Sequence, residues 1–205
     1  ARRTAWGLAG DASPGGRATV ADPLIIDLDA TLVTAHSEKE QARPTFKKGY
    51  GFHPLCAFAD HGPAGTGEPL TILLRPGNAG SNTATDHQKV IADALDQIGL
   101  GPRPGRRVLV RIDGAGSTKA TLETLTRRRV SYSVGFTLPM NTPELYHLVP
   151  EHVWSPAYNA DGQPRAGADV AEFTGLLDLA GWPAGMRVIV RRERPHRRSH
   201  GVAGA

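Results

Sequence analysis

Residues 24–33 read LIIDLDATLV, an apolar and β-branched run in which two acidic residues take alternate positions. Such a run predicts a buried β-strand. Alternate residues of a strand point to one face, so Asp27 and Asp29 should project from the same side, about 7 Å apart. Carboxylates inside an apolar strand are costly to desolvate unless something cationic meets them. The strand therefore predicts a cation site at its end, unless one acid faces solvent or caps a turn.

Two further strands are expected after this one, over residues 50–59 and 69–74. Three consecutive strands joined by loops indicate an antiparallel meander. Residues 85–98 then place apolar side chains at helical spacing, with Gly99 as the stop. This helix should pack on the sheet.

A fourth strand over residues 107–112 ends at Asp113, which is a further candidate metal ligand. We expect Ser117 to cap the following helix and a fifth strand to cover residues 130–136. Acids at the ends of two strands converge on bound metal if those strands are neighbours. A turn-forming role is the alternative for Asp113.

Composition excludes several protein classes. The chain has 205 residues, 24 Lys plus Arg against 20 Asp plus Glu, and 40% hydrophobic residues, which suits one globular core and not a disordered tail. Its single cysteine, Cys56, excludes a disulfide framework and a multi-cysteine zinc site. A single cysteine is what a reducing cytoplasm would leave, so we expect a cytoplasmic protein. No apolar run is long enough to span a bilayer, so we expect no membrane partner. Clustered arginines, such as those at 127–129, suit a nucleic-acid phosphate backbone.

The expected domain organisation follows from Pro and Gly content. Residues 11–16, DASPGG, should not hold a helix or strand, and we expect a linker there with a short helix before it. Many prolines between 139 and 185 indicate an irregular subdomain. We therefore divide the chain into a linker or the end of an N-terminal region (1–23), a core (24–138), an insertion (139–185), a strand returning to the core (186–195) and a basic tail (196–205).

Five segments in this order resemble the DDE transposases of bacterial insertion sequences, which have a ribonuclease H-like core. They are LIIDLDAT (24–31), YGFHPL (50–55), LRPGN (74–78), VRIDGAG (110–116) and RVIVRRERP (187–195). The resemblance covers nearly the whole chain. It implies an α/β fold with three antiparallel strands, a helix and further parallel strands, interrupted by an insertion.

The resemblance also implies a site. The Asp-x-Thr pattern favours Asp29 as the first catalytic acid, with Asp27 as the alternative, and the second acid falls on Asp113. Asp29 and Asp113 would hold Mg²⁺, or Mn²⁺, for in-line attack on DNA phosphodiesters. The third acid of such enzymes is a Glu on a helix, and neither Glu172 nor Glu193 lies in the expected motif. We therefore expect a chain truncated before the third acid, incomplete or inactive, or a tail that is out of frame.

The partner implied is DNA, at transposon ends, and the resemblance leaves room for a homodimer. Four basic residues on loops beside the first and third strands are candidate phosphate contacts: Lys39, Lys47, Lys48 and Arg75. Ordinary solvated charge is the alternative for each of them.

Two other functions stay open at this point. Residues 27–32, DLDATL, are similar to the first motif of haloacid dehalogenase-type phosphatases, in which Asp27 would be the nucleophile. That family needs a later acidic pair, and Ser117 and Thr118 stand where the partner of Asp113 should be. A remnant that binds DNA without cleaving it is the second alternative.

Overall fold

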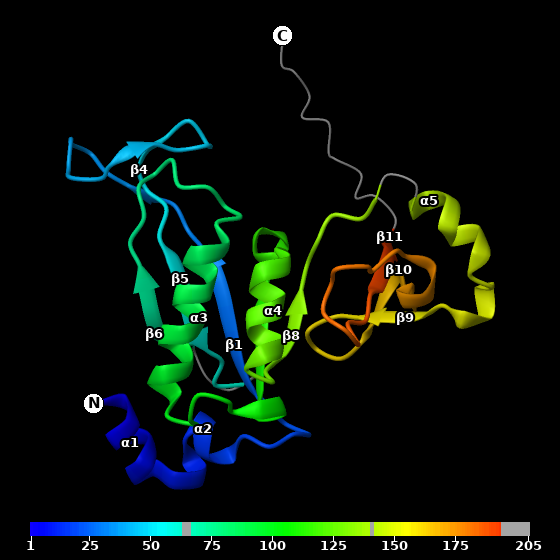
Figure 1. Cartoon of the computed structure of the whole chain (residues 1–205), viewed down its shortest axis with the longest axis horizontal. Coiled ribbons are helices and arrows are strands. Elements are labelled where there is room, and N and C mark those ends of the chain that lie inside the picture. Colours follow the sequence, from blue (N-terminus) through cyan, green and yellow to red (C-terminus); the bar gives the residue numbers. More distant parts are fainter. Residues whose placement is uncertain (63–66, 140–141, 194–205) are drawn as a thin grey trace. The chain divides into compact units, whose positions relative to one another are not determined.

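The structure is a computed structural model that describes residues 1–62, 67–139 and 142–193 (Figure 1). The chain divides into two compact units, residues 1–137 and residues 138–205. The expected basic tail, 196–205, lies outside the described residues.

The first unit is built on a five-stranded sheet in the order β6-β5-β1-β7-β8. Its strands are β1 (Leu24–Ala30), β5 (Leu55–Ala59), β6 (Glu68–Leu73), β7 (Val108–Ile112) and β8 (Ser131–Val134). β1 pairs with β5, and β5 with β6, in antiparallel fashion, whereas β1 with β7 and β7 with β8 are parallel. The expected α/β core of three antiparallel strands, a helix and further parallel strands is confirmed.

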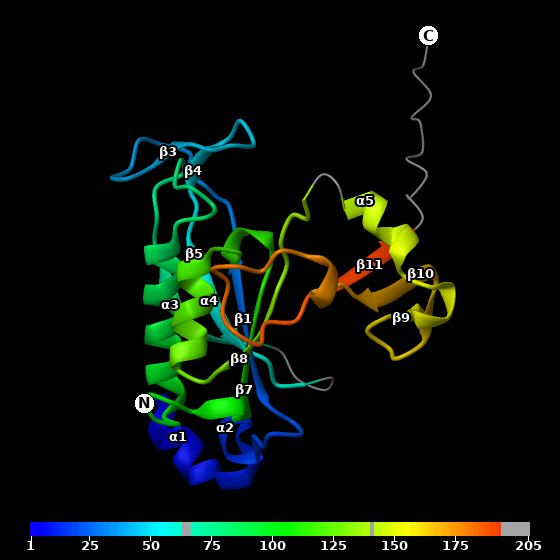
Figure 2. The ribbon, with the colours of Figure 1, turned by 45° about the vertical axis from the view of Figure 1, so that its right-hand side comes forward.

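Two helices, α3 (Ala84–Ile98) and α4 (Lys119–Arg127), cover one face of this sheet (Figures 1 and 2). Their packing follows from the alternation in β1, where Leu24, Ile26 and Leu28 are buried. Burying each such side chain contributes about 1.5–3 kcal/mol. The buried residues of α3 recur at helical spacing, and they are His87, Val90, Ile91, Ala94, Leu95 and Ile98. Gly99 ends the helix in the left-handed conformation, as its sequence predicted.

A small second sheet lies at the end of the first unit's main sheet. Its strands are β2 (Val33–Thr34), β3 (Arg43–Pro44) and β4 (Tyr50–Phe52), in the order β2-β4-β3. The single strand expected over 50–59 is therefore wrong: it is split into β4 and β5 at His53-Pro54. A proline has no N–H to donate to a ladder, which favours a break at this point.

The short helix expected before residue 11 is confirmed, but the residues that follow it are helical as well. The N-terminal residues form α1 (Arg2–Ala9), the 3₁₀-helix η1 (Gly10–Ala12) and α2 (Pro14–Arg17). Ser13 caps α2 by accepting a hydrogen bond from the Gly16 N–H, and Pro14 takes the first helical position, where its missing N–H is no loss. The expectation that residues 11–16 exclude a helix was wrong for this reason.

Glu68 of β6 ties α1 to the sheet. Its carboxylate accepts hydrogen bonds from Arg2, from the Trp6 Nε1–H at 3.3 Å and from His61 at 3.1 Å. Partial burial raises the pKa of Glu68, but the hydrogen bonds from Arg2, His61 and Trp6 outweigh it and hold the pKa below its usual value.

The second unit contains a three-stranded antiparallel sheet in the order β11-β10-β9. Its strands are β9 (Ser155–Tyr158), β10 (Pro164–Glu172) and β11 (Ile189–Glu193). Short helices complete the described elements of the chain: η2 (Gly105–Arg107) and η3 (Gly114–Gly116) in the first unit, and α5 (Thr142–Leu145), η4 (Tyr146–Leu148), η5 (Glu151–Val153) and η6 (Thr174–Leu176) in the second.

The core of this second unit is aromatic. Tyr146, Trp154 and Phe173 meet edge to face with ring centroids 5.6–5.9 Å apart, and Arg192 lies 4.1 Å over the Trp154 ring. Such contacts contribute beyond the area they bury.

The structure corrects two expectations for this part of the chain. The region predicted as an irregular insertion holds two strands, β9 and β10. The strand predicted to return to the core sheet, 186–195, instead pairs through β11 with β10, with Val170 opposite Arg191. Strand partners are chosen by contacts far apart in sequence, which a local pattern does not encode.

Candidate active site

Asp29 and Asp113 lie at equivalent places on two neighbouring parallel strands. In the ladder between β1 and β7, Leu28 is opposite Ile112, and each acid is the next residue along its strand direction. Paired strands are about 4.8 Å apart, so the two backbones are about that close here. Both side chains are exposed. The structure thus brings together the two acids that the sequence placed at strand ends.

The loop after β7 fixes the orientation of Asp113. One carboxylate oxygen accepts a hydrogen bond from the Ala115 N–H at 2.9 Å and caps η3, which leaves the other oxygen available. Gly116 lets the loop close on the strand, since a Cβ there would lie 2.3 Å from the Ile112 side chain. The helix cap predicted at Ser117 is wrong by one residue, because Thr118 accepts the hydrogen bond from the helix backbone.

Asp27 is engaged by a neighbouring arginine. Both oxygens of its carboxylate accept hydrogen bonds from Arg111, each at 2.6 Å, and Arg111 also donates to Asp60 at 3.1 Å. The hydrogen bond to Asp27 raises the pKa of Arg111 above its usual value, against a smaller effect of burial. No comparable hydrogen bond or ion pair engages Asp29 in the described part of the chain. Of the two acids on β1, Asp29 is therefore the one with a free carboxylate.

Cys56 lies opposite Asp29 across the ladder between β1 and β5. Burial and the negative charge of Asp29 raise the pKa of the Cys56 thiol, and the positive charge of Arg75 opposes this rise. The thiol is therefore a packed, protonated group beside the acid, with charges of both signs nearby.

Arg75 lies in the interior, although its loop position predicted a phosphate contact. Its side chain is 3% exposed. Nε donates to the His53 carbonyl at 2.9 Å, and Nη1 donates to Gly80 and Asp86 at 3.1 and 3.3 Å. Nη2 is buried without a hydrogen-bond partner. In this conformation Arg75 joins the β4–β5 junction, the loop after β6 and the start of α3. The run LRPGN (74–78), in which Pro and Gly bend the chain beside the arginine, was the only signal for such a role.

The three lysines predicted as phosphate contacts all lie on loops of the small second sheet, β2-β4-β3. Lys39, Lys47 and Lys48 are exposed on the loops that join β2, β3 and β4. Figure 1 shows β4 beyond the end of β1 at which Asp29 lies. These lysines, Asp29 and Asp113 therefore lie toward the same end of the main sheet.

Neither glutamate considered as a third acid is on a helix. Glu172 lies on β10, where hydrogen bonds from Arg187 and then Thr174 lower its pKa to about 2. Glu193 lies on β11 and pairs with Arg165 at 2.6 Å. Across residues 1–62, 67–139 and 142–193, no group of three or more His, Cys, Asp or Glu side chains is arranged to hold a metal ion. The acid site described here is thus a pair.

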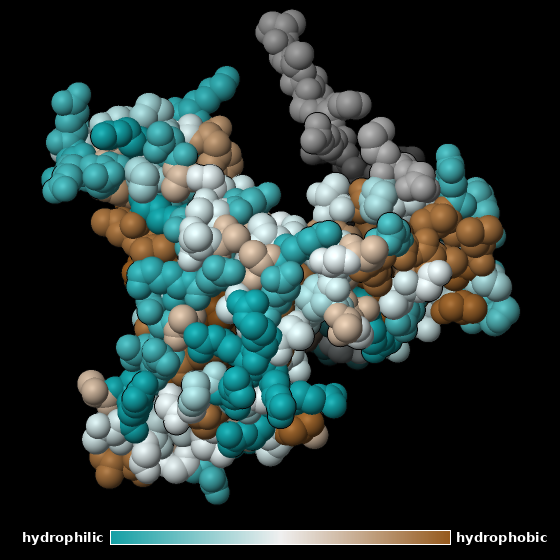
Figure 3. All heavy atoms as spheres, viewed as in Figure 1, coloured by the Kyte–Doolittle hydropathy of each residue, from teal (hydrophilic) through white to brown (hydrophobic). Residues whose placement is uncertain are grey.

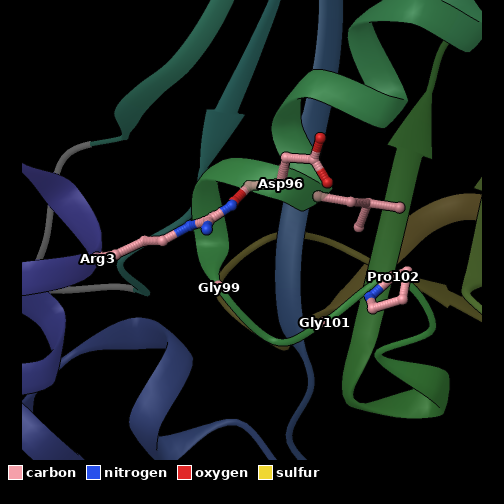
Figure 4. A pocket seen from close by; sticks show the side chains of 6 residues that line it. Arg3, Asp96, Gly99, Gly101 and Pro102 are labelled. Atoms are coloured by element: carbon pink, nitrogen blue, oxygen red, sulfur yellow. Dashed lines mark hydrogen bonds between the residues drawn. The ribbon is translucent and has the colours of Figure 1, made fainter.

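A separate cavity of about 220 Å³ lies at the C-terminal end of α3 (Figure 4). It is lined by Arg3, Leu95, Asp96, Gly99, Gly101 and Pro102. Arg3 is held there by the Asp96 carbonyl, which accepts its Nε–H at 2.8 Å. Arg75 contacts Asp86 in the first turn of α3, and Asp96 of the cavity lies ten residues farther along the helix, about 15 Å away.

Comparison with known families settles what kind of protein carries this acid pair. Residues 16–200 match the family model described as Transposase DDE domain group 1. The chain belongs to this family. Membership in this transposase family implies DNA binding and, in general, use of a divalent metal ion. The mixed parallel and antiparallel sheet is compatible with the ribonuclease H-like core of a DDE transposase. No curated protein sequence matches the chain.

Three findings contradict a phosphatase with Asp27 as its nucleophile. They are the transposase match, the antiparallel β1–β5–β6 segment and the ion pair between Asp27 and Arg111. Among the described helices, none is both long and apolar enough to cross a membrane.

Proposed function

We propose that Asp29 and Asp113 are the first and second metal-binding acids of a transposase that cleaves and joins DNA. The observation that carries the proposal is the register of β1 and β7, which sets two exposed carboxylates side by side while Arg111 occupies Asp27. Asp29, rather than Asp27, is then the acid that acts.

The donor set suits a small hard cation. Mg²⁺ takes oxygen ligands and is commonly held by one or two carboxylates together with waters and substrate phosphates. Asp29 offers an unpaired carboxylate, and Asp113 offers the oxygen not used by the Ala115 N–H. Mn²⁺ takes the same oxygen ligands. When bound, such an ion activates water and stabilises charge on the attacking and leaving oxygens of an in-line displacement.

Other side chains of the protein neutralise charge near the site and bind DNA phosphates. Arg111 neutralises Asp27 and Asp60, which keeps two further negative charges from repelling an approaching phosphate. Lys39, Lys47 and Lys48 bind phosphates by charge, so this part of the affinity falls as salt rises.

The direct test is metal-dependent nicking of supercoiled plasmid DNA by the whole chain. We expect nicking with Mg²⁺ or Mn²⁺, its loss in Asp29→Asn and Asp113→Asn, and its retention in Asp27→Asn. Loss in Asp27→Asn alone would refute the assignment.

A second function is supported by the strand positions and ion pairs of Glu172 and Glu193, and by the lack of any group of three acids arranged for a metal ion among the described residues. It is DNA binding without cleavage. Salt-sensitive binding by the unaltered chain, with no nicking at any metal concentration, would establish it in place of the first.

A further inference from the structure

The turn between β3 and β4 presents an aromatic side chain to solvent among lysines. Residues 45–49, TFKKG, form this turn, which we call the hairpin tip. Phe46 is 70% exposed there, far more than its apolar ring would favour. Lys47 and Lys48 follow it directly, and the Lys47 ammonium lies 5.7 Å from the centre of the Phe46 ring. The hairpin tip contains no acidic residue.

The hairpin tip is held in one conformation by its own backbone. The Thr45 N–H donates to the Gly49 carbonyl at 2.8 Å, and the Lys48 N–H donates to the Thr45 carbonyl at 3.0 Å. The Gly49 N–H adds a bond to the Thr45 hydroxyl at 3.1 Å. An exposed ring on such a closed turn loses little freedom when it binds.

Lys48 takes a backbone conformation that is uncommon for residues other than glycine. Its φ of +61° is the left-handed conformation, which glycine adopts freely. Hairpin turns of this kind favour glycine at the left-handed position. A lysine there adds a positive charge at the hairpin tip, in a conformation that Gln41 and Arg129 of this chain also adopt.

The ring of Phe46 is supported from behind. Its centroid lies 5.6 Å from that of His53, which is 4% exposed and bonded through Nδ1 to the Ala79 carbonyl. His53 is also joined to Arg75 by two backbone-directed hydrogen bonds. Phe46 is therefore an exposed platform that rests on a buried, fixed residue.

The base of the hairpin is fixed against the loop after β6. Gly51 has a φ of +154°, and a Cβ there would lie 2.0 Å from the Val33 carbonyl oxygen. A Cβ on Gly77 would lie 2.3 Å from the Arg43 carbonyl oxygen. The two glycines thus allow β4 to lie directly against β2, and the loop containing Gly77 to lie directly against β3 and β4.

The hairpin tip is also near the acid pair. The Thr31 N–H, two residues beyond Asp29, donates to the carbonyl of Pro54, which adjoins His53. Chain lengths along this route place Phe46 within about 25 Å of Asp29. That is the length of about seven base pairs of duplex DNA. The space-filling view shows a mostly hydrophilic surface over the β2–β4–β3 region (Figure 3).

We propose that Phe46 stacks on an unpaired base of the DNA near the cleavage site, while Lys47 and Lys48 hold the adjoining phosphates. This inference rests on the proposed function, because it takes DNA as the partner. Every base offers a π-face, and a ring flanked by cations binds single strands in this way. The hairpin tip thereby distinguishes a DNA end with unpaired bases from a fully paired one.

The test compares two DNA probes by fluorescence anisotropy without metal. One is a short blunt duplex, and the other is the same duplex with the last few bases of one end left unpaired. We expect Phe46→Ala to weaken binding to the forked probe by about 5- to 150-fold and to leave the blunt probe nearly unchanged. Phe46→Trp should retain the preference for the forked probe.

Two controls separate stacking from other effects. Ile72→Ala removes another exposed apolar side chain, 60% exposed on β6, and should change neither affinity. The double change Lys47→Gln and Lys48→Gln should weaken binding to both probes and reduce the slope of log affinity against log salt by about two.

The outcomes distinguish this inference from the proposed function. If the unaltered chain binds neither probe, the proposed function fails. If it binds both but Phe46→Ala weakens both equally, or neither, the stacking role of Phe46 is overturned and DNA binding stands. A melting temperature for Phe46→Ala close to that of the unaltered chain shows that the variant is folded.

Discussion

The choice between Asp27 and Asp29 can be decided by how metal ions change thermal stability. A ligand that binds only the folded state stabilises it by RT ln(1 + [L]/Kd). At ten times its Kd, Mn²⁺ therefore adds about 1.4 kcal/mol. For a chain of this size that raises the melting temperature by about 3–6 °C. We expect this rise for the unaltered chain.

Asp29→Asn should abolish the metal-dependent rise. It should leave the melting temperature without metal unchanged or slightly higher, because the two adjacent carboxylates no longer repel each other. Asp113→Asn should also abolish the rise.

Asp27→Asn should show the opposite pattern. The side chains of Asp27 and Arg111 are 38% and 45% exposed, so solvent screening limits their ion pair to about 0.5–1 kcal/mol. The variant should melt about 1–4 °C lower without metal and keep the full metal-dependent rise. Asp60→Asn is the matched control, because it removes the other carboxylate that forms an ion pair with Arg111.

Differential scanning fluorimetry with and without MnCl₂ measures all five proteins side by side. The opposite result would be a metal-dependent rise in melting temperature that is lost in Asp27→Asn and kept in Asp29→Asn. It would mean that the hydrogen bonds from Arg111 do not keep Asp27 from binding metal. The assignment of the first acid would then be wrong.

Two further predictions concern stability. The pKa of Glu68 is lowered in the folded state, so its contribution is present at neutral pH and is lost as pH falls below about 4.3 and through the folded pKa. Glu68→Gln should therefore lower the free energy of unfolding by about 1 kcal/mol at neutral pH and flatten the acid side of its pH profile, and a profile unchanged in shape would contradict this. Thr118→Ala removes the side-chain cap of α4 and should lower the free energy of unfolding by about 1 kcal/mol in urea titrations. Ser117→Ala should have a smaller effect, and equal effects would show that the cap is misassigned.

The central strand illustrates how much of the fold can be predicted from the sequence. Leu24, Ile26 and Leu28 alternate with Asp27 and Asp29, and this period of two by itself predicts a strand with one buried face. The helix that Gly99 ends was predictable for a similar reason, because its apolar spacing and its stop are both local.

The N-terminal segment and the strand near the C-terminal end show why the rest was not predictable. Pro14 suggested a linker, but it serves as the first residue of a helix that packs against other parts of the first unit. β11 has a clear strand pattern, yet its partner is β10. The pairing of β11 with β10 depends on contacts between residues that are distant in the chain, whereas the helix at Pro14 combines a local cap by Ser13 with packing inside the first unit.

The site formed by Asp29 and Asp113 was likewise predictable only in part. The sequence by itself determined that Asp29 and Asp113 stand at strand ends, because strand alternation and turn residues are encoded locally. Only the tertiary structure decided that the two strands are neighbours in register, that Arg111 takes Asp27 rather than Asp29, and that Arg75 is buried. Register and ion pairing join residues more than 80 positions apart, and their free energies arise only when the sheet has formed.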